Sequence, residues 1–346
     1  MTIQHIKKMV LGDSFAHGQP YSFLRENEHL GSNLILLGLG GSYAYGTNVE
    51  TSDVDIRGCA LNTKEEILTN QCFDQVVNEE TDTTVYSFNK LVSLLVNVNP
   101  NTIEMLGLKP EHYLYLSPIG EELIANRKMF LSRKCIKSFG GYANQQLYRL
   151  RQKEAHSMGQ VQLEEHILKT MLLMQEDFES DRLPEESLRL YIDKSEKPEM
   201  ETEIFMDVNL KHYPVRDYCG YWNSLQNVTK QYNTIGKRNE KALEHGKISK
   251  HMMHLVRLYL MCFDILENEE IVTYREKDHD FLMEIRNGKY VTEDNAVLPE
   301  FYEIVEDLEK RLLYDKENTS LPEKPDFDRI IDFISDVNYR VVCGEI

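Results

Sequence analysis

Two short motifs in the first sixty residues combine paired carboxylates with a glycine-serine turn. Asp53 and Asp55 are separated by one residue within the run 52–58. If this run is extended, alternate side chains point to the same side, so both carboxylates project together. Two neighbouring carboxylates repel each other, and Mg²⁺, which prefers hard oxygen ligands, relieves that repulsion. Gly41 and Ser42 offer backbone N–H groups and a hydroxyl to phosphate. The two motifs predict a site for a divalent metal and a phosphorylated ligand.

A strand, a short helix and a second strand are predicted to position these motifs. The apolar run 33–39 predicts a buried strand, and residues 42–46 predict the start of a short helix. Residues 47–52 are polar and turn-like, and residues 53–61 predict the second strand. This order resembles the core of the polymerase-β-like nucleotidyltransferase superfamily. The resemblance implies transfer of a nucleoside monophosphate from an NTP such as ATP, with Mg²⁺ (or Mn²⁺) as cofactor.

A third carboxylate is expected on a neighbouring strand, because two-metal sites commonly need one. The run 79–88 is rich in Thr, Val, Tyr and Phe, which predicts a strand. Asp82 within it shares a face with Thr84 and Tyr86, and Glu80 is the alternative ligand. The competing interpretation is that Asp82 only begins the strand after an acidic turn.

Two cations near these carboxylates are candidate phosphate ligands. Arg57 shares the predicted face of Asp53 and Asp55, so it either pairs with a carboxylate or contacts a phosphate. Lys90 follows the third-carboxylate strand on a helix predicted over residues 90–96. It could reach a triphosphate as a point charge, whereas the alternative is an ordinary solvated lysine.

A narrower resemblance extends along the chain. The pattern of Asp, Tyr-x-x-x-Lys and Asn-Pro-x-x-x-Glu-x-Leu is similar to a group of bacterial and phage nucleotidyltransferases, some associated with RNA repair. It implies an RNA end, with tRNA favoured, as the acceptor. Ser87 departs from the acidic residue that many members carry after the aromatic, which weakens a second carboxylate role there. The matching residues are Asp82, Tyr86, Lys90, Asn99, Pro100, Glu104 and Leu106.

The second half of the chain is predicted to be mainly helical, with helices expected over 132–153, 163–174 and 213–237. Lys250, His254 and Arg257 recur at i, i+4 and i+7, so they line one helix face and are candidates for binding the triphosphate or the acceptor. A solvated polar face is the alternative. Residues 179–205 predict a loop-rich insertion with a helical piece at 188–191. The apolar face of the 249–266 helix comprises Met252, Leu255, Val256, Leu258, Tyr259, Cys262 and Ile265.

The amino-acid composition disfavours some classes of protein. The 346 residues carry a formal net charge of −18, which disfavours non-specific coating of nucleic acid. A basic stretch with aromatics, residues 127–151, is the candidate for a local nucleic-acid contact, or else a solvated basic helix face. The six cysteines form no Cys-x-x-Cys pair, which indicates reduced thiols. Neither a secretory signal nor a membrane span is recognised, so a cytoplasmic location is predicted.

We therefore expect an α/β (α+β) nucleotidyltransferase domain with a mixed sheet over residues 1–125, followed by a mainly α-helical domain over 126–346. Asp53, Asp55 and Asp82 are the predicted metal ligands and catalytic residues. Alternatives are nucleotidylylation of a protein or small molecule in a toxin or defence role, and a nucleotide-binding module without activity. The predicted nucleotide ligands are Gly41, Ser42, Arg57, Lys90, Lys250, His254 and Arg257.

Overall fold

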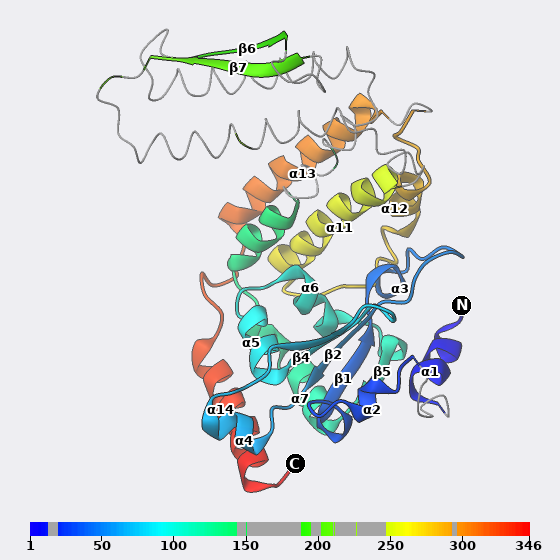
Figure 1. Cartoon of the computed structure of the whole chain (residues 1–346), viewed down its shortest axis with the longest axis vertical. Coiled ribbons are helices and arrows are strands. Elements are labelled where there is room, and N and C mark those ends of the chain that lie inside the picture. Colours follow the sequence, from blue (N-terminus) through cyan, green and yellow to red (C-terminus); the bar gives the residue numbers. More distant parts are fainter. Residues whose placement is uncertain are drawn as a thin grey trace. The chain divides into compact units, whose positions relative to one another are not determined.

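The computed structural model describes residues 1–12, 20–143, 150, 188–194, 202–209, 211, 226, 247–292 and 296–346. A mixed five-stranded sheet in the order β3-β4-β2-β1-β5 lies in the N-terminal part (Figure 1). Strands β2 and β4 are parallel, and the other neighbouring pairs are antiparallel. This confirms the predicted mixed sheet. The strands are β1 (Leu34–Leu39), β2 (Ile56–Ala60), β3 (Gln75–Asn78), β4 (Thr83–Ser87) and β5 (Tyr113–Leu116).

Strand β1 is covered on both faces, and all six of its residues are buried. Its register with β2 shifts between Leu34 and Leu36, so Ile35 and Leu36 both belong to one hydrophobic cluster while Leu37 and Leu39 belong to the other. The first cluster takes residues from α5 (Phe88–Leu95), α7 (Pro118–Ala125), α11 (Lys247–Asn268) and α14 (Phe327–Cys343). The second takes residues from α1 (Ile3–Leu11) and α2 (Phe23–Glu26).

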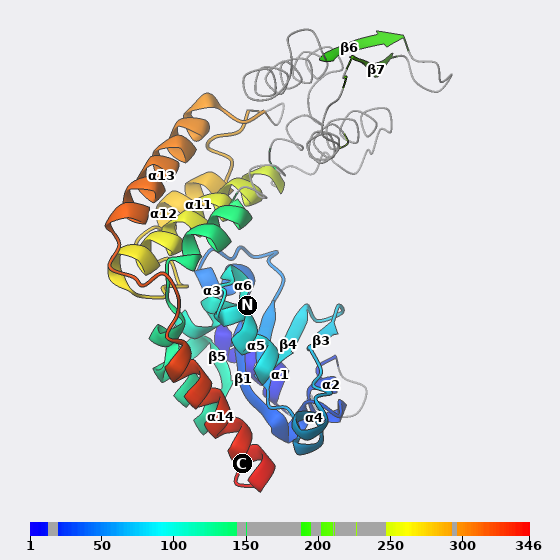
Figure 2. The ribbon, with the colours of Figure 1, turned by 90° about the vertical axis from the view of Figure 1, so that its left-hand side faces the viewer.

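The remaining helices are short around the sheet and longer towards the C-terminus. Figure 2 shows α11 grouped with α12 and α13. The side chain of Arg311 on α13 pairs with Glu267 on α11, and the Thr319 hydroxyl donates to the Leu266 carbonyl at 2.6 Å. These helices are α3 (Gly41–Tyr45), α4 (Lys64–Thr69), α6 (Pro100–Ile103), α12 (His279–Arg286) and α13 (Pro299–Asn318), with 3₁₀ turns Gly31–Asn33, Glu104–Gly107, Pro110–His112 and Arg127–Phe130.

The chain divides into two compact units. The first joins Met1–Gln146 to Met252–Lys289 and Glu300–Ile346, and the second comprises Leu147–His251 and Tyr290–Pro299. The predicted division at residue 125 differs from this partition, because α11 and α14 supply buried residues to the same hydrophobic cluster as α5 and α7.

One predicted helix is a strand. Strand β6 (Leu188–Lys194) pairs antiparallel with β7 (Thr202–Val208). The prediction of a helical piece at 188–191 within a loop was therefore wrong. Leu188, Leu190 and Ile192 recur every second residue, which is the period of a strand. The predicted apolar face of α11 is buried, as expected.

Several predicted helices reach beyond the described residues. The helix predicted from Ser132 is helical over 134–143, where its description stops. The helix predicted over 163–174 lies outside the described residues, as does nearly all of that predicted over 213–237. Within the residues that are described, no helix combines the length and the apolar character needed to cross a membrane.

Candidate active site

The parallel pairing of β2 with β4 brings two of the predicted carboxylates together. Ile56 pairs with Thr83, and the Ile56 N–H donates to the Asp82 carbonyl at 3.1 Å. Asp55 and Asp82 each precede the first residue of their strand. They therefore lie side by side where β2 and β4 begin.

Arg57 lies against both of these carboxylates. Its Nη2 is 3.7 Å from Asp55 Oδ1, and its Nη1 is 3.6 Å from Asp82 Oδ1. Nη1 also donates to the Asp82 carbonyl at 2.9 Å. The side chains of Arg57 and Asp55 are about a quarter exposed, at 23% and 22%, and that of Asp82 is 58% exposed. Arg57 thus pairs with both carboxylates, and its contact with a phosphate stays a prediction.

The glycine turn adjoins the same group. Gly41 has a φ of +55°, and a methyl group at its Cα would overlap the Asp55 carboxylate. The neighbouring Gly40 N–H donates to the Asp55 carbonyl at 2.8 Å. Position 41 thus requires glycine both for its left-handed backbone and for its close approach to Asp55. Ser42, the second residue of α3, is buried.

The three aspartates lie just outside the regular strands. Strand β2 begins at Ile56 rather than at Asp53, and Asp53 is exposed in the irregular segment before it. Asp82 has a φ of +44°, which aspartate tolerates better than most residues. Its direction is therefore set by a turn, and not by the strand alternation that the shared face with Thr84 and Tyr86 assumed.

The carboxylates of Asp55 and Asp82 fit a Mg²⁺ site that has few protein ligands. Among the described residues, no three His, Cys, Asp or Glu side chains are gathered closely enough to hold a metal ion. Mg²⁺ in proteins often takes only one or two carboxylates, with the remaining ligands from phosphate and water. Asp55 and Asp82, which already share one cationic neighbour, fit a site that the substrate completes.

Two predicted ligands have other surroundings. Lys90 Nζ is 2.6 Å from Asp74 Oδ2, so this lysine pairs with the segment before β3. Lys250 is exposed on α11 and falls in the second compact unit. Their roles as nucleotide ligands stay predictions.

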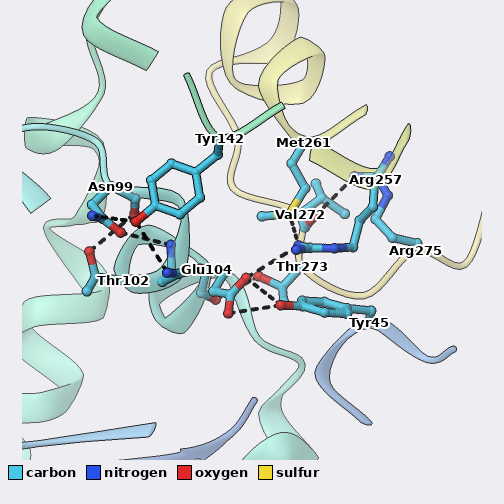
Figure 3. Close-up of polar contacts among 11 residues, drawn as sticks. Tyr45, Asn99, Thr102, Glu104, Tyr142, Arg257, Met261, Val272, Thr273 and Arg275 are labelled. Carbon is cyan, nitrogen blue, oxygen red and sulfur yellow. Dashed lines mark hydrogen bonds and ion pairs between the residues drawn. The ribbon is translucent and has the colours of Figure 1, made fainter. Parts of the chain in front are cut away.

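Arg257 belongs to a buried polar network at the end of α3, which Figure 3 shows. The Tyr45 hydroxyl donates to the Glu104 carboxylate, at 2.9 Å to Oε2 and 3.1 Å to Oε1. Arg257 Nη1 donates to Glu104 Oε2 at 3.4 Å, and its guanidinium carbon lies 3.6 Å from the centre of the Tyr45 ring. The His254 ring meets the Tyr45 ring edge to face, with centroids 6.3 Å apart.

Burial controls the titration of this network. It raises the pKa of Glu104, while the Arg257 charge and the Tyr45 hydrogen bond oppose that rise. It also raises the pKa of Tyr45, again against the charge of Arg257. The sequence analysis named Glu104 only among the residues that match the family pattern and did not single out Tyr45. The available signal was an unexplained glutamate inside a mostly apolar segment, 103–108.

Arg286 is a further residue that sequence reasoning did not assign to the site. Its Nη2 donates to the Ser52 hydroxyl at 3.3 Å, next to Asp53. Burial lowers the pKa of Arg286. The conformation of the segment before Asp53 is thus tied to the end of α12.

Comparison with known proteins gives one match. Neither a curated protein nor a solved structure matches the chain. The model of RlaP, the RNA repair pathway DNA polymerase beta family, matches residues 21–336. This range contains the sheet, the glycine turn, all three aspartates and α11. The match spans most of the 346 residues, and the chain therefore belongs to the RNA repair pathway DNA polymerase beta family.

Proposed function

We propose that this protein transfers a nucleoside monophosphate from an NTP to a hydroxyl at the end of an RNA, with tRNA as the favoured class, and releases pyrophosphate. Family membership supports a nucleotidyltransferase-like function. The observation that carries the proposal is the adjacency of Asp55 and Asp82 beside the Gly41 turn. The RNA acceptor rests on the RNA repair association of the family.

In this proposal the three aspartates bind the metal, and one of them also accepts a proton. Asp55 and Asp82 would hold Mg²⁺, or Mn²⁺, with phosphate and water as further ligands, and Asp53, exposed in the segment before β2, would add its carboxylate when the metal and the NTP bind. Asp82 would also accept the proton of the attacking hydroxyl as the bond to the α-phosphorus forms and that to pyrophosphate breaks. The bound metal would supply neutralisation of the phosphate charge. Gly41 and Ser42 would bind the β- and γ-phosphates through the start of α3.

The test is transfer of label from each α-³²P-NTP into total RNA and total protein, with Mg²⁺ or Mn²⁺. The parent protein is compared with Asp53→Ala and with Asp332→Ala, a control aspartate exposed on α14. Label in RNA that disappears only in Asp53→Ala is the expected result.

Other outcomes change the function in defined ways. Label in protein instead of RNA would support the alternative of protein nucleotidylylation. Absence of label in both, with Mg²⁺-dependent NTP binding retained, would reject the RNA acceptor and leave a small-molecule acceptor or an inactive binding module. Release of pyrophosphate from NTP in the presence of a small-molecule cell extract, by the parent but not by Asp53→Ala, then separates these two.

A further inference from the structure

The two ends of α3 have different surroundings. Gly41, at its start, lies against the Asp55 carboxylate. Tyr45, at its end and 4% exposed, directs its hydroxyl to Glu104 and its ring face to Arg257 (Figure 3). The helix has only five residues, so an anchor at one end restricts the other end.

Glu104 and Arg257, which contact Tyr45, form an anchor for the end of α3. This anchor is charged and buried, so the positions of its groups are restricted. Glu104 is 6% exposed and Arg257 is 5% exposed. A buried carboxylate or guanidinium is strongly destabilising unless it is paired and hydrogen-bonded, so each group constrains where its partners can lie. Arg257 also donates to Met261 Sδ at 3.0 Å. The Tyr45 side chain therefore contacts both members of the buried ion pair, Glu104 through its hydroxyl and Arg257 through its ring.

Backbone contacts reinforce this anchor from the segment after α11. The Arg275 N–H donates to the Tyr45 carbonyl at 3.0 Å, and the Thr273 hydroxyl donates to the Glu104 carbonyl at 2.7 Å. Gly46, which ends α3 with a φ of +76°, packs against the Tyr274 ring so closely that a methyl group would not fit. The end of α3 is thus held from both α11 and residues 273–275.

We infer that Tyr45, Glu104 and Arg257 are positioning residues that set the affinity of the site for the NTP by fixing α3, and with it the Gly41-Ser42 turn. This inference rests on the proposed function. It gives Arg257 a role that does not require contact with the triphosphate. Its Nη1 already donates to Glu104 and Met261, and the guanidinium carbon lies over the ring of Tyr45.

The most conservative test removes one hydroxyl. Tyr45→Phe keeps the ring under Arg257 and deletes the hydrogen bond to Glu104. Tyr113→Phe is the matched control, because it deletes another buried hydroxyl whose hydrogen bond, to the Met105 carbonyl at 3.0 Å, includes neither Tyr45 nor the Glu104 side chain. Both variants are measured for thermal unfolding, for Mg²⁺-dependent binding of a non-hydrolysable NTP analogue, and for KM and kcat.

The expected result separates affinity from stability. Small displacements of positioning groups can cost up to about a hundredfold, so we expect Tyr45→Phe to weaken analogue binding and raise KM by roughly tenfold. Tyr113→Phe should lower the melting temperature to a similar degree and leave both affinities at the parent value. Glu104→Leu should weaken binding as well, and combining it with Tyr45→Phe should add little, because both changes break the same hydrogen bond.

Failure of the inference is distinguishable from failure of the proposed function. If the parent binds the analogue and Tyr45→Phe binds it equally well, the positioning role is rejected and the nucleotidyltransferase function stands. If Tyr45→Phe and Tyr113→Phe weaken binding equally, the effect is one of general stability and the inference also fails. If the parent shows no Mg²⁺-dependent binding of any NTP analogue, both the proposed function and the inference are overturned.

Discussion

The two ends of α3 use the same pair of chemical groups in opposite environments. At the start of the helix, Arg57 lies between Asp55 and Asp82, with all three side chains at least one fifth exposed. At its end, Arg257 meets Glu104 with the two side chains only 6% and 7% exposed. A carboxylate and a guanidinium are thus accessible to ligands at one end and enclosed by protein at the other.

This difference indicates what each end can do. An exposed ion pair contributes little to stability, so its members are free to exchange partners when a metal or a phosphate arrives. A buried pair cannot exchange partners without leaving an uncompensated charge in the core. We therefore expect substitutions at the start of α3 to affect ligand binding and catalysis, and those at its end to affect folding first and ligand binding indirectly.

The largest expected effect is on catalysis. Asp55→Asn keeps the size of the side chain but removes a charge from the proposed metal site. Since metal-ion catalysis is worth several kcal/mol, nucleotidyl transfer should fall by about a thousandfold or more. The measurement is kcat/KM for label transfer together with the Mn²⁺ dissociation constant. An unchanged melting temperature would show that the pair of Asp55 with Arg57 does not stabilise the fold. Retained activity would exclude Asp55 from the site.

At the opposite end, Arg257→Leu tests the enclosed pair. The substitution leaves the Glu104 charge buried and should lower the free energy of unfolding by about 3–5 kcal/mol. Urea denaturation of both proteins measures this difference. The double variant with Glu104→Leu should recover part of the loss, because neither charge then remains unpaired. A loss below 1 kcal/mol in the single variant would mean that water reaches the pair in solution.

Gly41→Ala is expected to affect both stability and ligand binding. The left-handed backbone alone costs a non-glycine residue about 1–2 kcal/mol, and the added methyl group would displace the Asp55 carboxylate. We expect a small decrease in melting temperature with a much larger decrease in nucleotide affinity. Isothermal titration with an NTP analogue measures the affinity. Equal affinities in Gly41→Ala and in the parent would contradict a role in nucleotide binding for the close approach of this turn to the Asp55 carboxylate.

Asp315 is a buried carboxylate that lies near a second carboxylate, Glu267. Burial, with the nearby Glu267, raises its pKa to about 6 from 3.8. The folded state then binds the proton more tightly than the unfolded state, so stability falls as the pH rises from about 4 to above 6. Asp315→Asn should remove this decline and be more stabilising at pH 7 than at pH 4. Thermal unfolding across that pH range provides the measurement.

The smallest expected effect is at Lys90. Its pair with Asp74 is exposed, so Lys90→Met should change the free energy of unfolding by less than about 1 kcal/mol. The informative measurement is the KM for NTP. An increase of tenfold or more would place Lys90 among the triphosphate ligands, as predicted from the sequence. An unchanged KM would assign it to the surface.

Local patterns were sufficient to predict the elements around the carboxylates. The apolar run before Gly40 predicted β1, and the glycine turn followed by a short helix predicted α3. The partners of Arg257 could not be predicted in this way, because Glu104 lies 153 residues away in the sequence. The helix periodicity showed that Arg257 shares a face with His254, but not that this face meets Tyr45. The β6–β7 hairpin was missed because each strand depends on its partner for its hydrogen bonds.

The first compact unit is built from three separate stretches of the chain, which affects how it folds during synthesis on the ribosome. About a hundred residues separate Gln146 from Met252, where this unit resumes. At roughly 5–20 residues per second, the nascent sheet would wait some 5–20 seconds for α11, and longer for α14. During that interval the apolar surface that these helices later cover has no native partner. Production of residues 1–125 alone would make that interval permanent and should yield an aggregation-prone fragment.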